Sequence, residues 1–228
     1  MRAPMMNIHT VAAGGGSILG FRDGRLQVGP ESAGANPGPA SYRRGGPLTV
    51  TDCNVLLGKL QPDQFPNVFG PGGDAPLDAN IVRQKFLTLA REVAVKTGDP
   101  EMPPEQLAQG FLRIAVENMS NAIKKISVQR GYDVTRYTMN CFGGAGGQHA
   151  CLVADVLGIE TVFIHQFAGV LSAFGMGLAD VRAIKEHQFE QDVSHIAAAE
   201  AILADLDHQT RAQVHEQGIP DAQISLVR

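Results

Sequence analysis

A glycine-rich stretch between a strand-like and a helix-like segment is the feature that most restricts the fold of this chain. Residues 137–142 have the composition of a strand, and Gly143–Gly147 follow them directly. Residues 148–157 then have helical character, and 161–164 form a second strand-like run. Two strands joined by a loop and a helix are expected to be parallel, with a right-handed connection. The sequence therefore predicts an α/β fold.

Apolar periodicity predicts two long helices before this unit. Val82, Phe86, Leu89 and Val93 recur at spacings of three and four residues, which places one apolar stripe on a helix. A second, longer pattern begins after Pro103–Pro104 and ends near a glycine that suits a helix C-terminus. Helices are predicted at 78–96, 104–131, 170–178 and 194–217, and a final strand at 223–228.

The N-terminal third is predicted to be rich in loops, because glycine and proline recur throughout residues 11–47. Asp23-Gly24 lies between two strand-like runs and favours a hairpin turn. Residues 48–50 resemble a short strand, and Thr51 or Asp52 could cap a helix that extends through Lys59. We divide the chain into a loop and hairpin segment, 1–77, and an α/β lobe, 78–228, that the sequence leaves truncated at its C-terminus.

Composition excludes several function classes. The 19 basic and 23 acidic residues are nearly balanced and form no long run of one sign, so nucleic acid is not expected as a partner. No apolar run approaches the length of a membrane span, and no secretory leader is evident. The three cysteines lack CxxC spacing, which fits a reducing, cytoplasmic setting.

The second glycine cluster, as we name residues 143–147, is the strongest candidate site. Without side chains, Gly143, Gly144, Gly146 and Gly147 with Ala145 would let a ligand lie against the backbone at a helix N-terminus. Gln148-His149 stand where a phosphate loop needs Lys and Ser or Thr, and the dinucleotide fingerprint also fails. From pattern alone, a ligand site and a tight structural turn remain equally open.

Weaker candidates lie earlier in the chain. The first glycine cluster, Gly14, Gly15, Gly16 and Ser17, could approach a phosphate or carboxylate, although a hairpin contact or bulge is the commoner reason for such glycines. Asp52 and Asn54 could bind a cation or substrate, but an aspartate there is more often a helix cap. No histidine or cysteine spacing indicates a metal site, so His9, His149 and His165 are interpreted as structural.

Six runs of the sequence have a familiar pattern: Asn7–Ser17, Val28–Ala40, Leu48–Gly58, Phe142–Ala150, Ile164-His165 and Gly169–Asp180. Together they resemble the hydantoinase A and 5-oxoprolinase family. Where hydantoinase A relatives and acetone carboxylase subunits more often read Gly-Pro-Leu-His, this chain has Gly147-Gln148-His149. The sequence therefore resembles the ATP-hydrolysing 5-oxoprolinase branch most.

The resemblance implies the second lobe of an actin- and sugar kinase-like ATPase fold, in which Gly143 and Gly144 support the adenosine of ATP and Ala145–Gly147 complete the turn. It also implies cleavage of 5-oxo-L-proline to L-glutamate with ATP hydrolysis, Mg²⁺, a K⁺-like cation, and partner regions of hydantoinase A and hydantoinase B type. A homo-oligomer is compatible with it. We expect a partial chain without a complete active site, inactive alone, with catalytic residues unassigned.

Two alternatives to this hypothesis remain open. One is a segment of an N-methylhydantoinase or acetone carboxylase-type ATPase subunit, with the same lobe and another substrate. The other is a non-catalytic assembly module whose glycine turns are purely structural.

Overall fold

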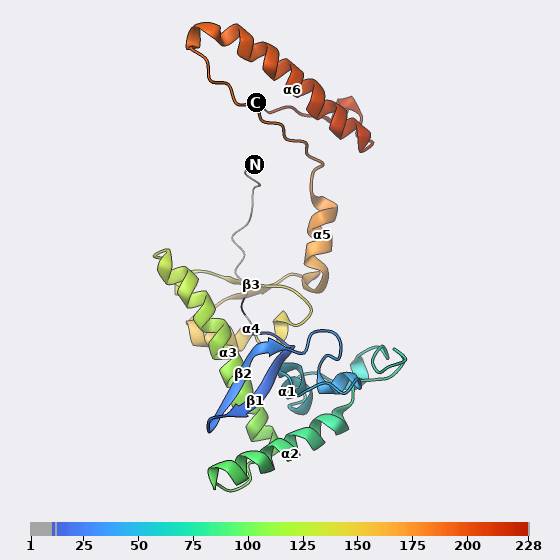
Figure 1. Ribbon diagram of the computed structural model, residues 1–228, viewed down its shortest axis with the longest axis vertical. Helices are drawn as coiled ribbons and strands as arrows, with labels where there is room; N and C mark the ends of the chain where they lie inside the picture. Colours follow the sequence, from blue (N-terminus) through green and yellow to red (C-terminus); the bar gives the residue numbers. More distant parts are fainter. Residues whose placement is uncertain (1–10, 12, 228) are drawn as a thin grey trace. The chain divides into compact units, whose positions relative to one another are not determined.

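The computed structural model describes residues 11 and 13–227 and contains both helices and strands, as an α/β fold requires (Figure 1). The chain forms two compact units, Met1–Leu171 and Ser172–Arg228. The boundary that the sequence predicted between residues 77 and 78 falls inside the first unit, and that division stays a prediction. His9, one of the histidines considered above, lies outside the described residues.

A β-hairpin opens the first unit, as predicted. Strands β1 (Ser17–Arg22) and β2 (Arg25–Ser32) pair in antiparallel fashion. Asp23 and Gly24 join them with φ angles of 51° and 71°, a conformation that Asp-Gly turns adopt readily. The sequence pattern of the turn therefore identified the hairpin correctly.

The strand predicted at 48–50 is wrong. Only an isolated bridge between Ile18 and Thr49 forms there, because Val50 already begins helix α1 (Val50–Leu56). Thr49 is the N-cap of α1, so the cap lies before the two predicted residues. Asp52 is instead the third helical residue, and its carboxylate accepts from the Thr49 amide at 2.8 Å.

Helices α2 (Ala79–Thr97) and α3 (Pro104–Gln129) agree with the predicted ranges and supply much of the core. Asp78 is the N-cap of α2, and its side chain accepts from the Ile81 amide; Gly98 is the C-cap, in the left-handed conformation. Helix α3 contacts α1, α2, α4 and β2, so it links the hairpin to the rest of the unit (Figure 1). The fully buried apolar side chains include Val82, Phe86, Leu107 and Phe111.

The predicted strand, loop, helix and strand unit is confirmed. Strands β3 (Met139–Cys141) and β4 (Val162–Ile164) pair in parallel, and α4 (Ala150–Leu157) connects them. Helix α4 packs through its apolar face on the C-terminal half of α3. This unit carries the second glycine cluster between β3 and α4.

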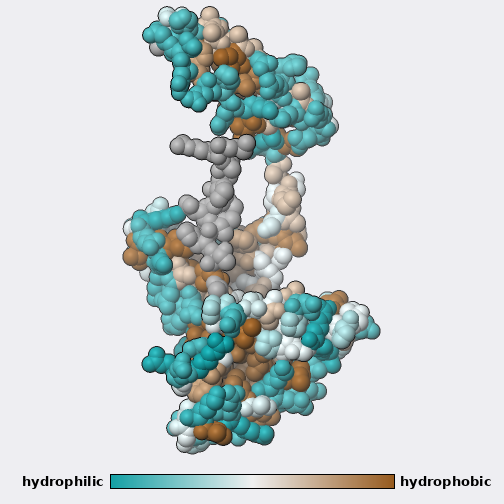
Figure 2. Space-filling model, in the orientation of Figure 1, coloured by the Kyte–Doolittle hydropathy of each residue, from teal (hydrophilic) through white to brown (hydrophobic). Residues whose placement is uncertain are grey.

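The second unit contains all of helix α5 (Leu171–Leu178) except its first residue, and helix α6 (Ile196–Glu216). The strand predicted at 223–228 is wrong for its described residues: a short 3₁₀ turn, Asp221–Gln223, is followed by irregular chain. A strand needs a neighbour to receive its backbone hydrogen bonds, and the sequence pattern could not reveal whether one was present. Helix α6 exposes both hydrophilic and hydrophobic side chains (Figure 2).

The other short 3₁₀ turns lie at Ala40–Tyr42, Pro62–Gln64, Val134–Arg136, Gly146–Gln148, Ala168–Val170 and Val193–His195. Within the described part of the chain, no helix has the length and apolar character needed to cross a membrane.

Candidate functional site

The second glycine cluster forms a short, largely exposed turn between β3 and α4. Gly143 has a φ of 94°, which a residue with a side chain rarely adopts, so glycine is required at the point where the chain leaves β3. The Gly143 amide donates to the carbonyl of Ala168 at 2.8 Å, beyond β4. The Gly146 amide donates back to the Gly143 carbonyl at 3.3 Å and closes the turn.

The glycines of this cluster differ in the space around them. A Cβ at Gly143, Gly144 or Gly147 would meet no heavy atom within 4 Å. A Cβ at Gly146 would lie 2.8 Å from Sγ of Cys141, which is closer than real side chains approach. Packing therefore explains Gly146, whereas the backbone around Gly144 faces open space that a ligand could enter.

Helix α1 holds the end of this turn through Asn54. Nδ2 of Asn54 donates to Oε1 of Gln148 at 2.6 Å and lies 3.3 Å from Nε2 of His149. Asn54 is completely buried and His149 is 5% exposed. These contacts connect residues that are far apart in the sequence and fix the second glycine cluster against α1.

His149 is kept neutral by its surroundings. Burial lowers the pKa of its imidazole, and the nearby positive charge of Lys59 lowers the pKa further. Nζ of Lys59 also donates to the carbonyl of Gln148 at 3.4 Å. A cationic side chain is thus positioned beside the second glycine cluster.

The first glycine cluster packs on the other end of α1. The amide and the hydroxyl of Thr51 both donate to the Gly15 carbonyl, at 2.8 and 3.0 Å. A Cβ at Gly15 would lie 2.7 Å from Oγ1 of Thr51, and one at Gly16 would lie 2.9 Å from Oγ of Ser32. Oγ of Ser17 accepts from the Gly14 amide at 3.0 Å. Close packing beside the irregular start of the hairpin accounts for Gly15 and Gly16.

Asp52 has a structural role in this arrangement. Its fully buried carboxylate accepts from the amides of Ala40, Ser41 and Thr49 at 3.0, 2.9 and 2.8 Å, and from the Thr49 hydroxyl at 3.1 Å. Burial, and then the charge of Asp52, raise the pKa of the Tyr42 hydroxyl. The described residues contain no group of three His, Cys, Asp or Glu side chains that could hold a metal ion. The metal role suggested for Asp52 stays a prediction.

The structure thus brings the two glycine clusters to one helix, since Thr51 binds the first and Asn54 and Lys59 reach the second. The sequence had named Asn54 and His149 individually, but it gave no sign that they meet. Lys59 was named only as the end of a predicted helix, and its place beside the second glycine cluster was missed. The local signal for Lys59 was the glycine before it, because glycine often ends a helix. In the structure Gly58 is left-handed and α1 has already ended.

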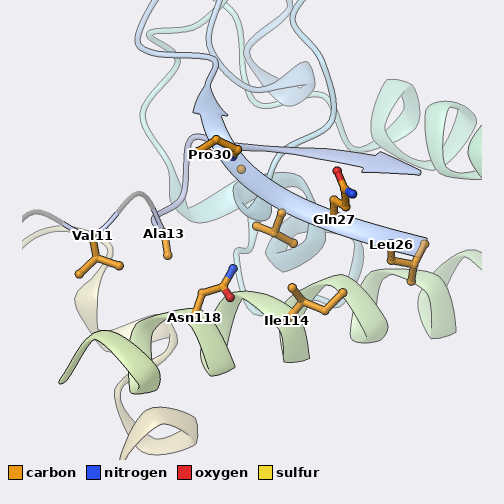
Figure 3. Close-up of a pocket in the computed structure, with 9 residues that line it drawn as sticks. Val11, Ala13, Leu26, Gln27, Pro30, Ile114 and Asn118 are labelled. Atoms are coloured by element: carbon orange, nitrogen blue, oxygen red, sulfur yellow. The ribbon is translucent and has the colours of Figure 1, made fainter. Parts of the chain in front are cut away.

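The first unit also has an open, mainly apolar pocket of about 510 Å³ between β2 and α3 (Figure 3). Leu26 of β2 faces Ile114 of α3 across it, and Gln27 of β2 and Asn118 of α3 also line it. The remaining lining residues are Val11, Ala13, Val28, Gly29 and Pro30. None of the predicted site residues lines this pocket.

Comparison with known proteins decides the family. The family described as Hydantoinase/oxoprolinase matches residues 1–185, most of the chain. The chain belongs to the hydantoinase/oxoprolinase family. This confirms the resemblance on which the sequence analysis relied.

Among hydantoinase/oxoprolinase relatives, the chain is 42% identical to 5-oxoprolinase 1 of Arabidopsis thaliana, over 99% of this chain and 18% of that protein. It is 48% identical to 5-oxoprolinase of Saccharomyces cerevisiae, over 82% of this chain and 14% of that protein. The caprolactamase subunit alpha of Pseudomonas jessenii is 37% identical over 78% of this chain and 24% of that subunit. The chain therefore spans less than a fifth of both 5-oxoprolinases.

The crystal structure of the ATP-dependent caprolactamase from Pseudomonas jessenii has a similar fold. It matches 91% of this chain and 30% of that chain, with a TM-score of 0.65 and 32% sequence identity. The mixed helix and strand architecture is therefore that of a solved member of the hydantoinase/oxoprolinase family.

Proposed function

We propose that these residues are a segment of an ATP-dependent amidohydrolase that opens the lactam of 5-oxo-L-proline to L-glutamate while ATP is hydrolysed. Identities of 42% and 48% to proteins named 5-oxoprolinase support this substrate. We propose further that the α/β unit is part of the second lobe of an actin- and sugar kinase-like ATPase. The other regions of hydantoinase A and hydantoinase B type would complete the active site.

The second glycine cluster is the proposed contact for the adenosine side of ATP. The open space around Gly143, Gly144 and Gly147 is the observation that carries this assignment, because a flat ligand can approach the backbone there without meeting a side chain. Lys59 adds positive charge beside the cluster. The residues present therefore fit a nucleoside with an attached anionic group.

ATP would supply a phosphoryl group that turns the oxygen of an unstrained amide into a good leaving group. The role of this chain is then to bind and orient the nucleotide. Mg²⁺ and a K⁺-like ion belong to the proposal through the family resemblance. The described residues contain no group of three His, Cys, Asp or Glu side chains that could hold Mg²⁺. Asp52 is already engaged by protein donors.

The proposal is tested with the whole polypeptide that carries these residues. ADP is measured together with the ring-opened product, which is glutamate from 5-oxo-L-proline and the N-carbamoyl amino acid from hydantoins. We expect glutamate and ADP to form together and only when both 5-oxo-L-proline and ATP are present. ATP-dependent turnover of hydantoins without turnover of 5-oxo-L-proline would instead support the N-methylhydantoinase alternative.

A larger lactam is the second candidate substrate, because the caprolactamase resembles this chain in both sequence and structure. Caprolactam is therefore included in the same assay. A kcat/KM for caprolactam above that for 5-oxo-L-proline would move the assignment to this substrate. Absence of turnover with 5-oxo-L-proline, hydantoins and caprolactam would favour an assembly module.

A further inference from the structure

The contact between α1 and the second glycine cluster depends on one side-chain amide. A carboxamide nitrogen carries two hydrogens. Nδ2 of Asn54 has an acceptor for each, Oε1 of Gln148 at 2.6 Å and Nε2 of His149 at 3.3 Å. Removing this one amide therefore removes two hydrogen bonds to the turn.

The same amide determines where His149 carries its proton. Because Nδ2 of Asn54 only donates, Nε2 of His149 must accept, and a neutral imidazole that accepts at Nε2 carries its hydrogen at Nδ1. Burial and Lys59 keep the ring neutral by lowering its pKa. A protonated His149 would place an N–H against the amide hydrogens of Asn54, so protonation opposes the contact.

The pair is not arranged for stability alone. Oδ1 of Asn54 and Nδ1 of His149 are buried, and neither has a hydrogen-bond partner within the described part of the chain. Leaving a buried polar group unpaired costs about 1–3 kcal/mol. Two apolar side chains would avoid this cost, but they could not hold Gln148 at the end of the turn.

We propose that Asn54 is a positioning residue of the nucleotide site, which acts through Gln148 and His149 to fix the second glycine cluster against α1. The backbone beside Gly144 then stays open for the nucleoside. The inference rests on the proposed function, because it gives the positioned turn a nucleotide to bind.

Two variants of Asn54 test the inference. Asn54→Ala removes both donors, and Asn54→Asp keeps the shape of the side chain but replaces the donor with an acceptor. Asn67→Ala is the matched control, because Asn67 is an exposed asparagine. We expect the amides of Gly146 and His149 to exchange hydrogen at least tenfold faster in Asn54→Ala and at unchanged rates in the control.

The pH dependence distinguishes positioning from a general loss of stability. In Asn54→Asp the carboxylate can accept from protonated His149, so we expect a higher His149 pKa and recovery of slow exchange as the pH falls. Nitrogen chemical shifts of His149 in the unmodified chain should show hydrogen on Nδ1 and none on Nε2. A hydrogen on Nε2 of His149 overturns the inference. So does an equal exchange rate of the Gly146 and His149 amides in Asn54→Ala and the unmodified chain.

Kinetics of the whole polypeptide provide the functional part of the test. Asn54→Ala should raise the KM for ATP at least tenfold and leave the KM for the lactam unchanged. An active Asn54→Ala enzyme with an unchanged KM for ATP overturns the inference and leaves the proposed function standing. An unmodified enzyme that hydrolyses lactam without ATP overturns the proposed function, and the nucleotide role of Asn54 with it.

Discussion

Thr51 and Gly15 are joined by two hydrogen bonds to one carbonyl oxygen, and the space between them is too small for a methyl group. This contact ties the first glycine cluster to α1. Asn54, on the same helix, contacts Gln148 and His149, which follow the second glycine cluster. Helix α1 is therefore the element through which the two glycine-rich segments are placed.

Gly15→Ala should destabilise the chain by about 1–3 kcal/mol, the usual cost of forcing an extra carbon into a packed contact. Its Cβ would lie 2.7 Å from Oγ1 of Thr51. Gly14→Ala is the matched control, because a Cβ there meets nothing within 4 Å. Chemical denaturation measures both, and equal stabilities of the two variants would contradict the packing explanation.

Asp52→Asn should cost about 2–4 kcal/mol of unfolding free energy, since one of two carboxylate oxygens becomes a donor that faces protein donors. Four hydrogen bonds from Ala40, Ser41 and Thr49 converge on this carboxylate. Asp63→Asn, at an exposed position, should change stability by less than about 0.5 kcal/mol. If both variants have the stability of the unmodified chain, Asp52 does not organise the turn at residues 40–42.

Gly144→Leu and Gly146→Leu should separate binding from folding. The first places its side chain in open space, so we expect the unfolding midpoint to be unchanged and the dissociation constant for ATP to rise at least tenfold. The second meets Sγ of Cys141 and should lower the midpoint. Thermal unfolding and nucleotide titration of the whole polypeptide provide the two readouts. Unaltered ATP binding in Gly144→Leu would remove this residue from the site.

Lys59→Gln should raise the pKa of His149 toward, but not up to, its ordinary value. Burial, the larger cause, still lowers the pKa when the charge of Lys59 is gone. An NMR titration of the His149 ring measures the change, with Lys96→Gln on α2 as the control. A His149 pKa that is identical in the Lys59 variant and the unmodified chain would exclude the electrostatic coupling.

Stability should also fall as the pH drops below about 6.5, the usual pKa of an unfolded histidine. His149 resists protonation in the folded chain, so the unfolded state binds the extra proton first. The contribution of His149 to the free energy of unfolding is complete above that pH and decreases as the pH falls below it. In His149→Gln this part of the pH dependence should disappear, which denaturation at several pH values can show.

Local sequence signals predicted the elements that depend on local chemistry. Asp23-Gly24 identified the hairpin, and apolar periodicity located α2 and α3. The strands predicted at 48–50 and 223–228 failed because a strand depends on its neighbours more than on its own residues. Residues 48–50 instead lead into a helix, with Thr49 as the N-cap and Val50 as the first residue of α1.

The candidate site was only partly predictable for the same reason. A glycine run after a strand located the turn, but the reason why each position is glycine depends on the atoms that surround it in the structure. Cys141 explains Gly146, whereas open space surrounds Gly144. The contact of Asn54 with Gln148 joins distant parts of the chain, and the apolar periodicity of a sequence does not predict such a pair.

A nucleotide-bound structure of the whole polypeptide tests the central claim most directly. The account predicts that the adenosine lies against the backbone of Gly143 and Gly144, with Asn54 in contact with Gln148 and His149. A nucleotide bound elsewhere, with this turn covered by protein, would contradict it.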